Sequence, residues 1–237
     1  MIITNSTPDK YYYNQLIAFL MSIKINSPKH LNLIIVFLAN YPIDLELRLR
    51  KAFTEVTFEN NPLKMKDSRG FALIIDRAFR VKECLNKYKE PVTWIDTDII
   101  IRDDISELLN VGAKQLKILY RKGTPERVRI NAGVFTIGYS VITHKFISDW
   151  YNKIKIGHKW GDGQLVFWRI FKKYMQKKQI KMIDLSLKFN STGKFNDEYV
   201  IWHCKKGHFD REKYQVEYQD YLAKAKRYMK DIWRGNE

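Results

Sequence analysis

The first half of the chain alternates short apolar runs with longer amphipathic segments, and this alternation constrains the fold more than any other feature. The apolar runs have the length of strands, and the segments between them space their apolar residues as a helix does. Strands that alternate with helices form parallel sheets, and strands covered on both faces read as continuous apolar runs. The pattern therefore predicts an α/β fold with a mostly parallel central sheet and helices on both faces. The predicted strands are residues 1–5, 33–40, 56–58 and 92–101, and the predicted helices are residues 11–26, 45–53 and 70–88.

The second half mixes strands and helices less regularly and ends in a basic, aromatic helix. We find no internal repeat, no linker rich in Pro, Gly or Ser, and no low-complexity segment. We therefore expect one domain at residues 1–210, followed by a C-terminal helix at residues 211–237. The predicted strands of this half are residues 117–120, 132–138, 180–190 and 199–204, and the predicted helices are residues 140–155, 163–178 and 211–234.

The composition limits where the chain works and what it binds. The 237 residues carry a formal net charge of +16, which favours anionic partners such as nucleic acid, nucleotides, phospholipid surfaces or acidic glycans. The only cysteines, Cys84 and Cys204, lie far apart, so a reducing compartment is the simplest expectation. The N-terminus does not read as a signal peptide, and no apolar run is long enough to span a membrane. We expect a cytoplasmic protein, with attachment to the cytoplasmic face of a membrane left open.

Two acids interrupt an apolar run in the sequence WIDTDIIIRDD. Asp96 and Asp98 are separated by Thr97 and follow the run 92–95, which is the fourth predicted strand. Side chains at positions i and i+2 of an extended chain point to the same side, so both carboxylates can bind one hard cation such as Mg²⁺ or Mn²⁺. The alternative is a pair of exposed strand-end acids that contact lysines. The next two acids, Asp103 and Asp104, precede a short helical pattern and are interpreted as the start of that helix.

Three further motifs carry polar or small residues at the predicted ends of strands and helices. The segment Asn131-Ala132-Gly133 lets backbone approach a ligand closely, although it also suits a turn that enters a strand. Asp162 and Gln164 open a predicted helix, where Asp162 suits either an N-cap or a polar substrate pocket. The third motif holds His203, which is a candidate third metal ligand, and Lys206 with Gly207, which are candidates for contacts with phosphate oxygens.

The order of these motifs resembles the metal-dependent glycosyltransferases of the GT-A fold, most closely family 8. The resemblance covers about residues 1–208 and implies a single Rossmann-like GT-A domain. It implies that Asp96, Asp98 and His203 hold Mn²⁺ or Mg²⁺, which binds the diphosphate of a nucleotide sugar, most often a UDP-sugar. The remaining implied roles are donor binding for Thr4, Asn5, Arg77, Arg80, Thr97, Asn131, Ala132, Gly133, Lys206 and Gly207, and a catalytic role for Asp162 and Gln164.

The sequence departs from the family pattern at two of these motifs. Gly163 separates Asp162 from Gln164, whereas the family usually has Asp and Gln adjacent. The late motif reads His203-x-x-x-Gly207, and the Lys-Pro-Trp that usually follows is absent. These departures leave open which of Asp162 and Gln164 fills which role, and whether Lys205 or Lys206 contacts the phosphate.

The resemblance implies transfer of a sugar from a nucleotide sugar to a glycan, lipid or protein acceptor with retention of the anomeric configuration. Because no side chain reads as a nucleophile, we hypothesise a front-face transfer through an oxocarbenium-like state. The alternatives are an inverting GT-A enzyme, a phosphatase of the haloacid-dehalogenase type, and a basic nucleic-acid-binding protein. The phosphatase motif normally ends the first strand, and nucleic-acid binding does not explain acids placed beside an apolar run.

The C-terminal helix admits two interpretations. Its aromatic stripe can pack on the domain, or it can attach the protein to an anionic membrane. The stripe consists of Tyr214, Tyr218, Tyr221, Leu222, Ala225, Tyr228, Met229, Ile232 and Trp233, beside Lys224, Lys226, Arg227, Lys230 and Arg234.

Overall fold

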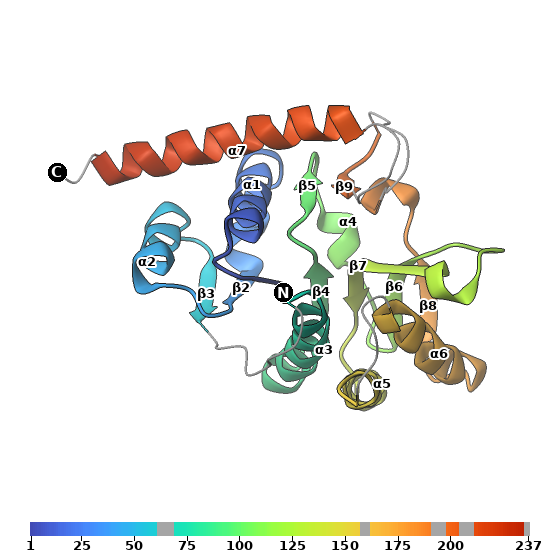
Figure 1. The fold of residues 1–237 in the computed structure, drawn as a ribbon. Helices are drawn as coiled ribbons and strands as arrows, with labels where there is room; N and C mark the ends of the chain where they lie inside the picture. Colours follow the sequence, from blue (N-terminus) through green and yellow to red (C-terminus); the bar gives the residue numbers. More distant parts are fainter. Residues whose placement is uncertain (61–68, 157–161, 191–197, 204–210, 235–237) are drawn as a thin grey trace. The chain divides into compact units, whose positions relative to one another are not determined.

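The computed structural model describes residues 1–60, 69–156, 162–190, 198–203 and 211–234 (Figure 1). Within these ranges the chain divides into two compact units that interleave along the sequence. Unit 1 comprises Met1–Ile3, Leu63–Ile95 and Ser106–Ser186. Unit 2 comprises Thr4–Pro62, Asp96–Ile105 and Leu187–Glu237.

The central sheet has seven strands in the order β3-β2-β1-β4-β7-β6-β8, and β1 is shared by both units. Strand pairs β1–β4, β2–β3 and β6–β8 are parallel, whereas β7 runs antiparallel to both of its neighbours. The prediction of an α/β fold with a mostly parallel sheet is therefore confirmed. The strands are β1 (Ile2–Ser6), β2 (Ile34–Leu38), β3 (Thr57–Asn60), β4 (Val92–Ile95), β6 (Gln115–Tyr120), β7 (Ile130–Ile137) and β8 (Lys181–Asp184).

Unit 1 packs three long helices against its part of the sheet. Helix α3 lies against α5 and β4, and α6 lies against α5 and β7. An aromatic cluster fills the space between these helices and β7. Within it, the ring centroids of Trp150 and Phe167 are 4.7 Å apart. The helical segments of unit 1 are α3 (Arg69–Tyr88), α4 (Ser106–Leu109), η2 (Glu126–Val128), α5 (Val141–Ile154) and α6 (Asp162–Gln176).

Unit 2 contains a second, two-stranded sheet in which β5 (Ile99–Ile101) and β9 (Ile201–His203) run antiparallel. Helix α1 packs on β5, and the long helix α7 lies along α1 and also contacts α2 (Figure 1). The helical segments of unit 2 are α1 (Lys10–Asn26), η1 (Pro28–Leu33), α2 (Ile43–Ala52), η3 (Leu187–Phe189) and α7 (Arg211–Arg234). The helix predicted at residues 211–234 is thus confirmed.

Two predicted strands differ from the observed ones by more than two residues at an end. The run at residues 92–101 is not one strand, because β4 joins the seven-stranded sheet whereas β5 pairs with β9 in the other sheet. Asp96 and Asp98 therefore lie in the connection between β4 and β5. The strand predicted at residues 180–190 is shorter, since β8 ends at Asp184 and the 3₁₀ turn Leu187–Phe189 follows.

One glycine after β7 permits an unusually close approach of two backbone segments. A Cβ atom on Gly138 would lie 1.9 Å from the carbonyl oxygen of Gly112. No side chain can occupy that space, so Gly138 fixes how the end of β7 meets the segment before β6.

Candidate active site

Three side chains of unit 2 gather around one point, although His203 is far from the other two in sequence. One ligand atom each from Asp96, Asp98 and His203 can be chosen so that all lie within 4.8 Å of one another. The strand register explains the meeting, because Ile99 pairs directly with His203 between β5 and β9. Asp98 immediately precedes Ile99, so the antiparallel pairing brings its carboxylate to the imidazole.

The imidazole of His203 is fully buried, and both of its nitrogens face oxygen atoms. Nδ1 lies 3.2 Å from Oδ1 of Asn190, which is also fully buried. An amide oxygen only accepts hydrogen bonds, so this contact places a proton on Nδ1. The other nitrogen, Nε2, lies 3.1 Å from Oδ1 of Asp98 but makes no hydrogen bond of acceptable geometry with the described residues.

A lone pair on Nε2 and a carboxylate oxygen repel each other at this distance unless a cation compensates them. A second proton on the ring of His203 would supply that positive charge, and so would a metal ion. The presence of Asp96 favours the metal ion, since two carboxylates and one imidazole form a ligand set for Mn²⁺ or Mg²⁺. A metal-binding histidine usually donates its other ring N–H to an oxygen atom, and the Asn190 amide oxygen occupies that position beside His203. The residues present therefore fit a divalent cation.

The predicted base and ribose contacts, Thr4 and Asn5, lie in the part of β1 that belongs to unit 2. Thr4 is fully buried, and its Oγ1 has no hydrogen-bond partner among the described residues. Asn5 and Thr97 are also buried, each with 8% of its surface exposed. Because Thr4 is fully buried, only a ligand that enters the fold could reach its hydroxyl.

In unit 1, the backbone of Ala132 is held from two sides. Nη1 of Arg77 donates to the carbonyl oxygen of Ala132 over 2.8 Å, and the Ala132 N–H donates to Oε1 of Gln164 over 3.1 Å. The Arg77 guanidinium also lies over the ring of Trp94, 5.1 Å from its centroid. The sequence motif at Asn131-Ala132-Gly133 is therefore a constrained segment of β7.

The same segment interrupts the pairing of β7 with β6. Ile118 pairs with Phe135, whereas the next residue, Leu119, pairs with Asn131. The residues between them bulge out of the ladder, and Oδ1 of Asn131 accepts a hydrogen bond from the Gly133 N–H over 3.0 Å. Bulges of this kind are frequent beside active sites because they redirect backbone groups.

Arg80 contacts an acid on its own helix. Its Nε lies 3.0 Å from Oδ1 of Asp76, one turn earlier on α3, and both side chains are nearly buried. The guanidinium carbon also lies 5.2 Å from the ring centroid of Phe79. These contacts hold the Arg80 side chain against its own helix, α3, within unit 1.

The glycine that separates Asp162 from Gln164 has a packing explanation. A Cβ atom on Gly163 would lie 2.7 Å from Cγ2 of Ile74 and 3.4 Å from Cδ1 of Ile154. The missing side chain therefore lets the start of α6 approach both α3 and α5. Asp162 is the first residue of α6. Lys206 and Gly207 lie outside the described residues.

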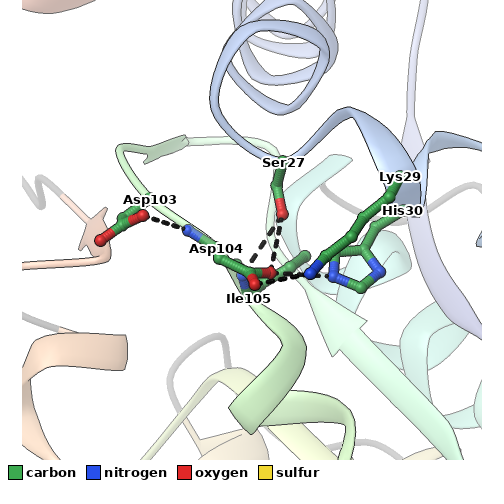
Figure 2. A network of polar contacts seen from close by, with 6 residues as sticks. All are labelled: Ser27, Lys29, His30, Asp103, Asp104 and Ile105. Carbon is green, nitrogen blue, oxygen red and sulfur yellow. Dashed lines mark hydrogen bonds and ion pairs between the residues drawn. The ribbon is translucent and has the colours of Figure 1, made fainter.

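The second pair of acids in WIDTDIIIRDD has other contacts, as Figure 2 shows. The Asp104 carboxylate accepts a hydrogen bond from Lys29 over 2.7 Å and lies 3.0 Å from Nε2 of His30. The Asp103 carboxylate accepts a hydrogen bond from the Asp104 N–H over 2.7 Å. Helix α4 begins two residues later, at Ser106. Asp104 thus ties the loop after β5 to η1, a role that the helix-start interpretation did not include.

Asn190 is the functional candidate that the sequence did not reveal. It follows η3 and belongs to no motif, and asparagine is common in loops. Only the fold brings its amide to His203. A sequence signal for this contact would have required knowledge of the β5–β9 pairing.

The aromatic stripe of α7 is buried in part. Tyr214, Tyr221, Leu222 and Ala225 are buried, and α7 contacts α1 and α2. The basic side chains of the helix that the structure describes are exposed: Lys213, Lys224, Lys226, Arg227 and Lys230. Among the described residues, no helix combines the length and apolarity that a membrane span needs.

The fold is similar to that of several solved glycosyltransferase structures. The apo structure of the bifunctional glycosyltransferase WbbM superposes with a TM-score of 0.67 at 14% identity, over 98% of this chain and 51% of WbbM. The glycosyltransferase GlyE of Streptococcus pneumoniae TIGR4 gives a TM-score of 0.64 at 14% identity, over 99% of this chain and 63% of GlyE.

The galactosyltransferase LgtC, solved in complex with donor and acceptor sugar analogues, gives a TM-score of 0.60 at 14% identity. That match covers 92% of this chain and 95% of LgtC. This chain therefore spans about half of WbbM and less than two thirds of GlyE. No protein-family model matches the sequence, and no curated protein matches it. At these identities the likeness establishes a fold of the GT-A kind.

Proposed function

We propose that the protein is a metal-dependent glycosyltransferase that moves a sugar from a nucleoside-diphosphate sugar to a glycan, lipid or protein acceptor. The observation that carries the proposal is the convergence of Asp96, Asp98 and the buried His203 within 4.8 Å of one another, in a fold of the GT-A kind. A UDP-sugar is the expected donor, by the family resemblance described above. The expected location is the cytoplasm.

Asp96, Asp98 and His203 would hold the divalent cation, Mn²⁺ or Mg²⁺. When bound, the cation supplies positive charge where the departing nucleoside diphosphate gains negative charge. Asn190 keeps the imidazole in the tautomer whose Nε2 is free to coordinate, because its amide oxygen accepts from Nδ1. Burial of His203 keeps water from competing for that nitrogen.

In this proposal the segment Asn131-Ala132-Gly133 faces the transferred sugar with backbone groups. The contacts of Arg77 and Gln164 with Ala132 support that role, because they fix the segment before any substrate binds. Gln164, together with Asp162 at the start of α6, orients the sugar.

The rest of the donor would be bound by residues from several segments. Thr4 and Asn5 contact the base and ribose, and Thr97 lies between the two metal-binding acids. Arg80 contributes positive charge near the donor. Lys206 and Gly207 hold phosphate oxygens, as the resemblance implies.

We propose that the transfer retains the anomeric configuration through a front-face, oxocarbenium-like state. The support is the family resemblance and the lack of an obvious nucleophile in the motifs. Proton NMR of the first product formed reports the anomeric configuration directly. An inverted product would refute this part of the proposal and leave the metal site untouched.

Peripheral membrane contact through α7 would depend on its basic face, because four residues of the aromatic stripe, Tyr214, Tyr221, Leu222 and Ala225, are buried. Sedimentation with liposomes that contain anionic lipid tests this contact. Replacing Lys224, Lys226, Arg227 and Lys230 by glutamine should abolish it, whereas binding that survives the replacement would refute it.

The activity itself is tested by a screen of nucleotide sugars for Mn²⁺-dependent hydrolysis. Hydrolysis of one donor should disappear in Asp98→Ala and persist in Asp103→Ala, a matched control for an acid placed in the same sequence. Activity that is independent of metal, or equal in both variants, would refute the proposal. Binding of DNA or RNA with a steep salt dependence, without binding of any nucleotide sugar, would favour the nucleic-acid alternative.

A further inference from the structure

One face of α7 contacts the residues on either side of β5, the strand that follows Asp96 and Asp98. The hydroxyl of Tyr214 donates a hydrogen bond to the carbonyl oxygen of Asp98 over 3.1 Å. One turn later, the Glu217 carboxylate lies 3.1 Å from Nε of Arg102, and both side chains are largely buried. These contacts join α7 to the residues immediately before and after β5.

Asn26, at the end of α1, provides a third connection between α7 and this region. Its side-chain amide donates to the carbonyl oxygen of Ile101 over 2.8 Å and to the hydroxyl of Tyr221 over 2.6 Å. Tyr214, Glu217 and Tyr221 lie at positions i, i+3 and i+7, which place them on one face of a helix. Helix α7 is therefore bonded directly to the residue on each side of β5 and, through Asn26, to Ile101 at its end.

Tyr214 also reaches the strand that carries the histidine. Its ring lies edge-on to Trp202, with centroids 5.3 Å apart, and only 4% of Tyr214 is exposed. Trp202 directly precedes His203 in β9. A single buried residue thus contacts the backbone of one metal-binding residue and the neighbour of another.

We propose that α7 clamps the metal site and that Tyr214 is its positioning residue. The hydroxyl holds the Asp98 backbone while the ring holds Trp202, and together they fix the separation between the Asp98 carboxylate and the His203 imidazole. The inference rests on the proposed function, in which these two side chains bind the cation. Tyr214 does not touch the metal; it acts by preorganising two ligands, which raises affinity by lowering the ordering cost of binding.

The test compares Tyr214→Phe with Tyr218→Phe in the full chain. The first variant keeps the ring against Trp202 and removes the hydroxyl. The second removes a hydroxyl from the ring stacked on Tyr214, 6.0 Å away. The dissociation constant for Mn²⁺ is measured by calorimetry and by electron paramagnetic resonance of free Mn²⁺, well below the unfolding temperature. A net contribution typical of one hydrogen bond predicts about three- to tenfold weaker binding by Tyr214→Phe, and no change for Tyr218→Phe.

The outcomes separate this inference from the proposed function. A merely structural role lowers the unfolding temperature of Tyr214→Phe and leaves the Mn²⁺ affinity of the folded protein unchanged, which would overturn the inference alone. Equal weakening in both tyrosine variants would also overturn it, since the specific bond to Asp98 would then not matter. Failure of the unmodified protein to bind Mn²⁺ would overturn the proposed metal site and this inference with it.

Discussion

Asn190 offers the sharpest single test of how His203 is prepared for a metal ion. Its amide oxygen lies 3.2 Å from Nδ1 of the fully buried imidazole. Asn190→Ala removes that acceptor and leaves a buried N–H unsatisfied, which costs about 1–3 kcal/mol. The proton can then move to Nε2, where it blocks coordination. Loss of such an outer partner lowers metal affinity about 10- to 100-fold, or about 1.4–2.8 kcal/mol.

The assay is calorimetric titration of Mn²⁺ into Asn190→Ala, Asn190→Asp and Asn152→Ala. Asn190→Asp keeps an accepting oxygen and should retain affinity, whereas Asn152→Ala changes an exposed asparagine on α5 and should match the unmodified protein. Thermal unfolding of each metal-free variant shows that it is folded. If folded Asn190→Ala binds Mn²⁺ within twofold of the unmodified protein, the assignment of the Nε2 lone pair is refuted.

Three further predictions concern stability. Gly138→Ala should prevent folding or lower the free energy of unfolding in urea by more than about 3 kcal/mol, because its Cβ would lie 1.9 Å from the Gly112 carbonyl oxygen. A loss of less than about 1 kcal/mol would contradict the close approach. Gly163→Ala should cost about 1–2 kcal/mol through contact with Ile74, and Ile74→Ala should make the same change harmless. Burial raises the pKa of Tyr218 to about 12, so stability present below pH 10 should decline as pH rises toward 12, because the unfolded chain releases this proton first. Urea unfolding across that range should show a shallower decline in Tyr218→Phe, and an identical decline would refute the assignment.

The sequence predicted most of the fold because its periodicities are strong and local. The apolar run of β2 and the amphipathic pattern of α1 reflect burial that each segment imposes by itself. The break at Asp96–Asp98 was missed because Ile99, Ile100 and Ile101 continue the apolar run of β4. Only the pairing of β5 with β9 shows that these isoleucines belong to another sheet.

The sequence could predict only those site residues whose type and spacing are themselves typical of a metal site. Two acids at i and i+2 and a late histidine are visible in the sequence, and the structure brings them together. Asn190 and Tyr214 act through an amide oxygen and a hydroxyl placed by tertiary contacts, and neither has a local pattern. The packing role of Gly163 was likewise invisible, since it depends on Ile74 from another helix.

The central claim is that Asp96, Asp98 and His203 bind one divalent cation. Anomalous diffraction from crystals grown with Mn²⁺ and UDP tests it most directly, because the signal locates the metal without reference to activity. If these residues bind the cation, one anomalous peak lies within bonding distance of all three side chains and of the diphosphate oxygens. A peak elsewhere, or UDP bound with no metal at these residues, would contradict it.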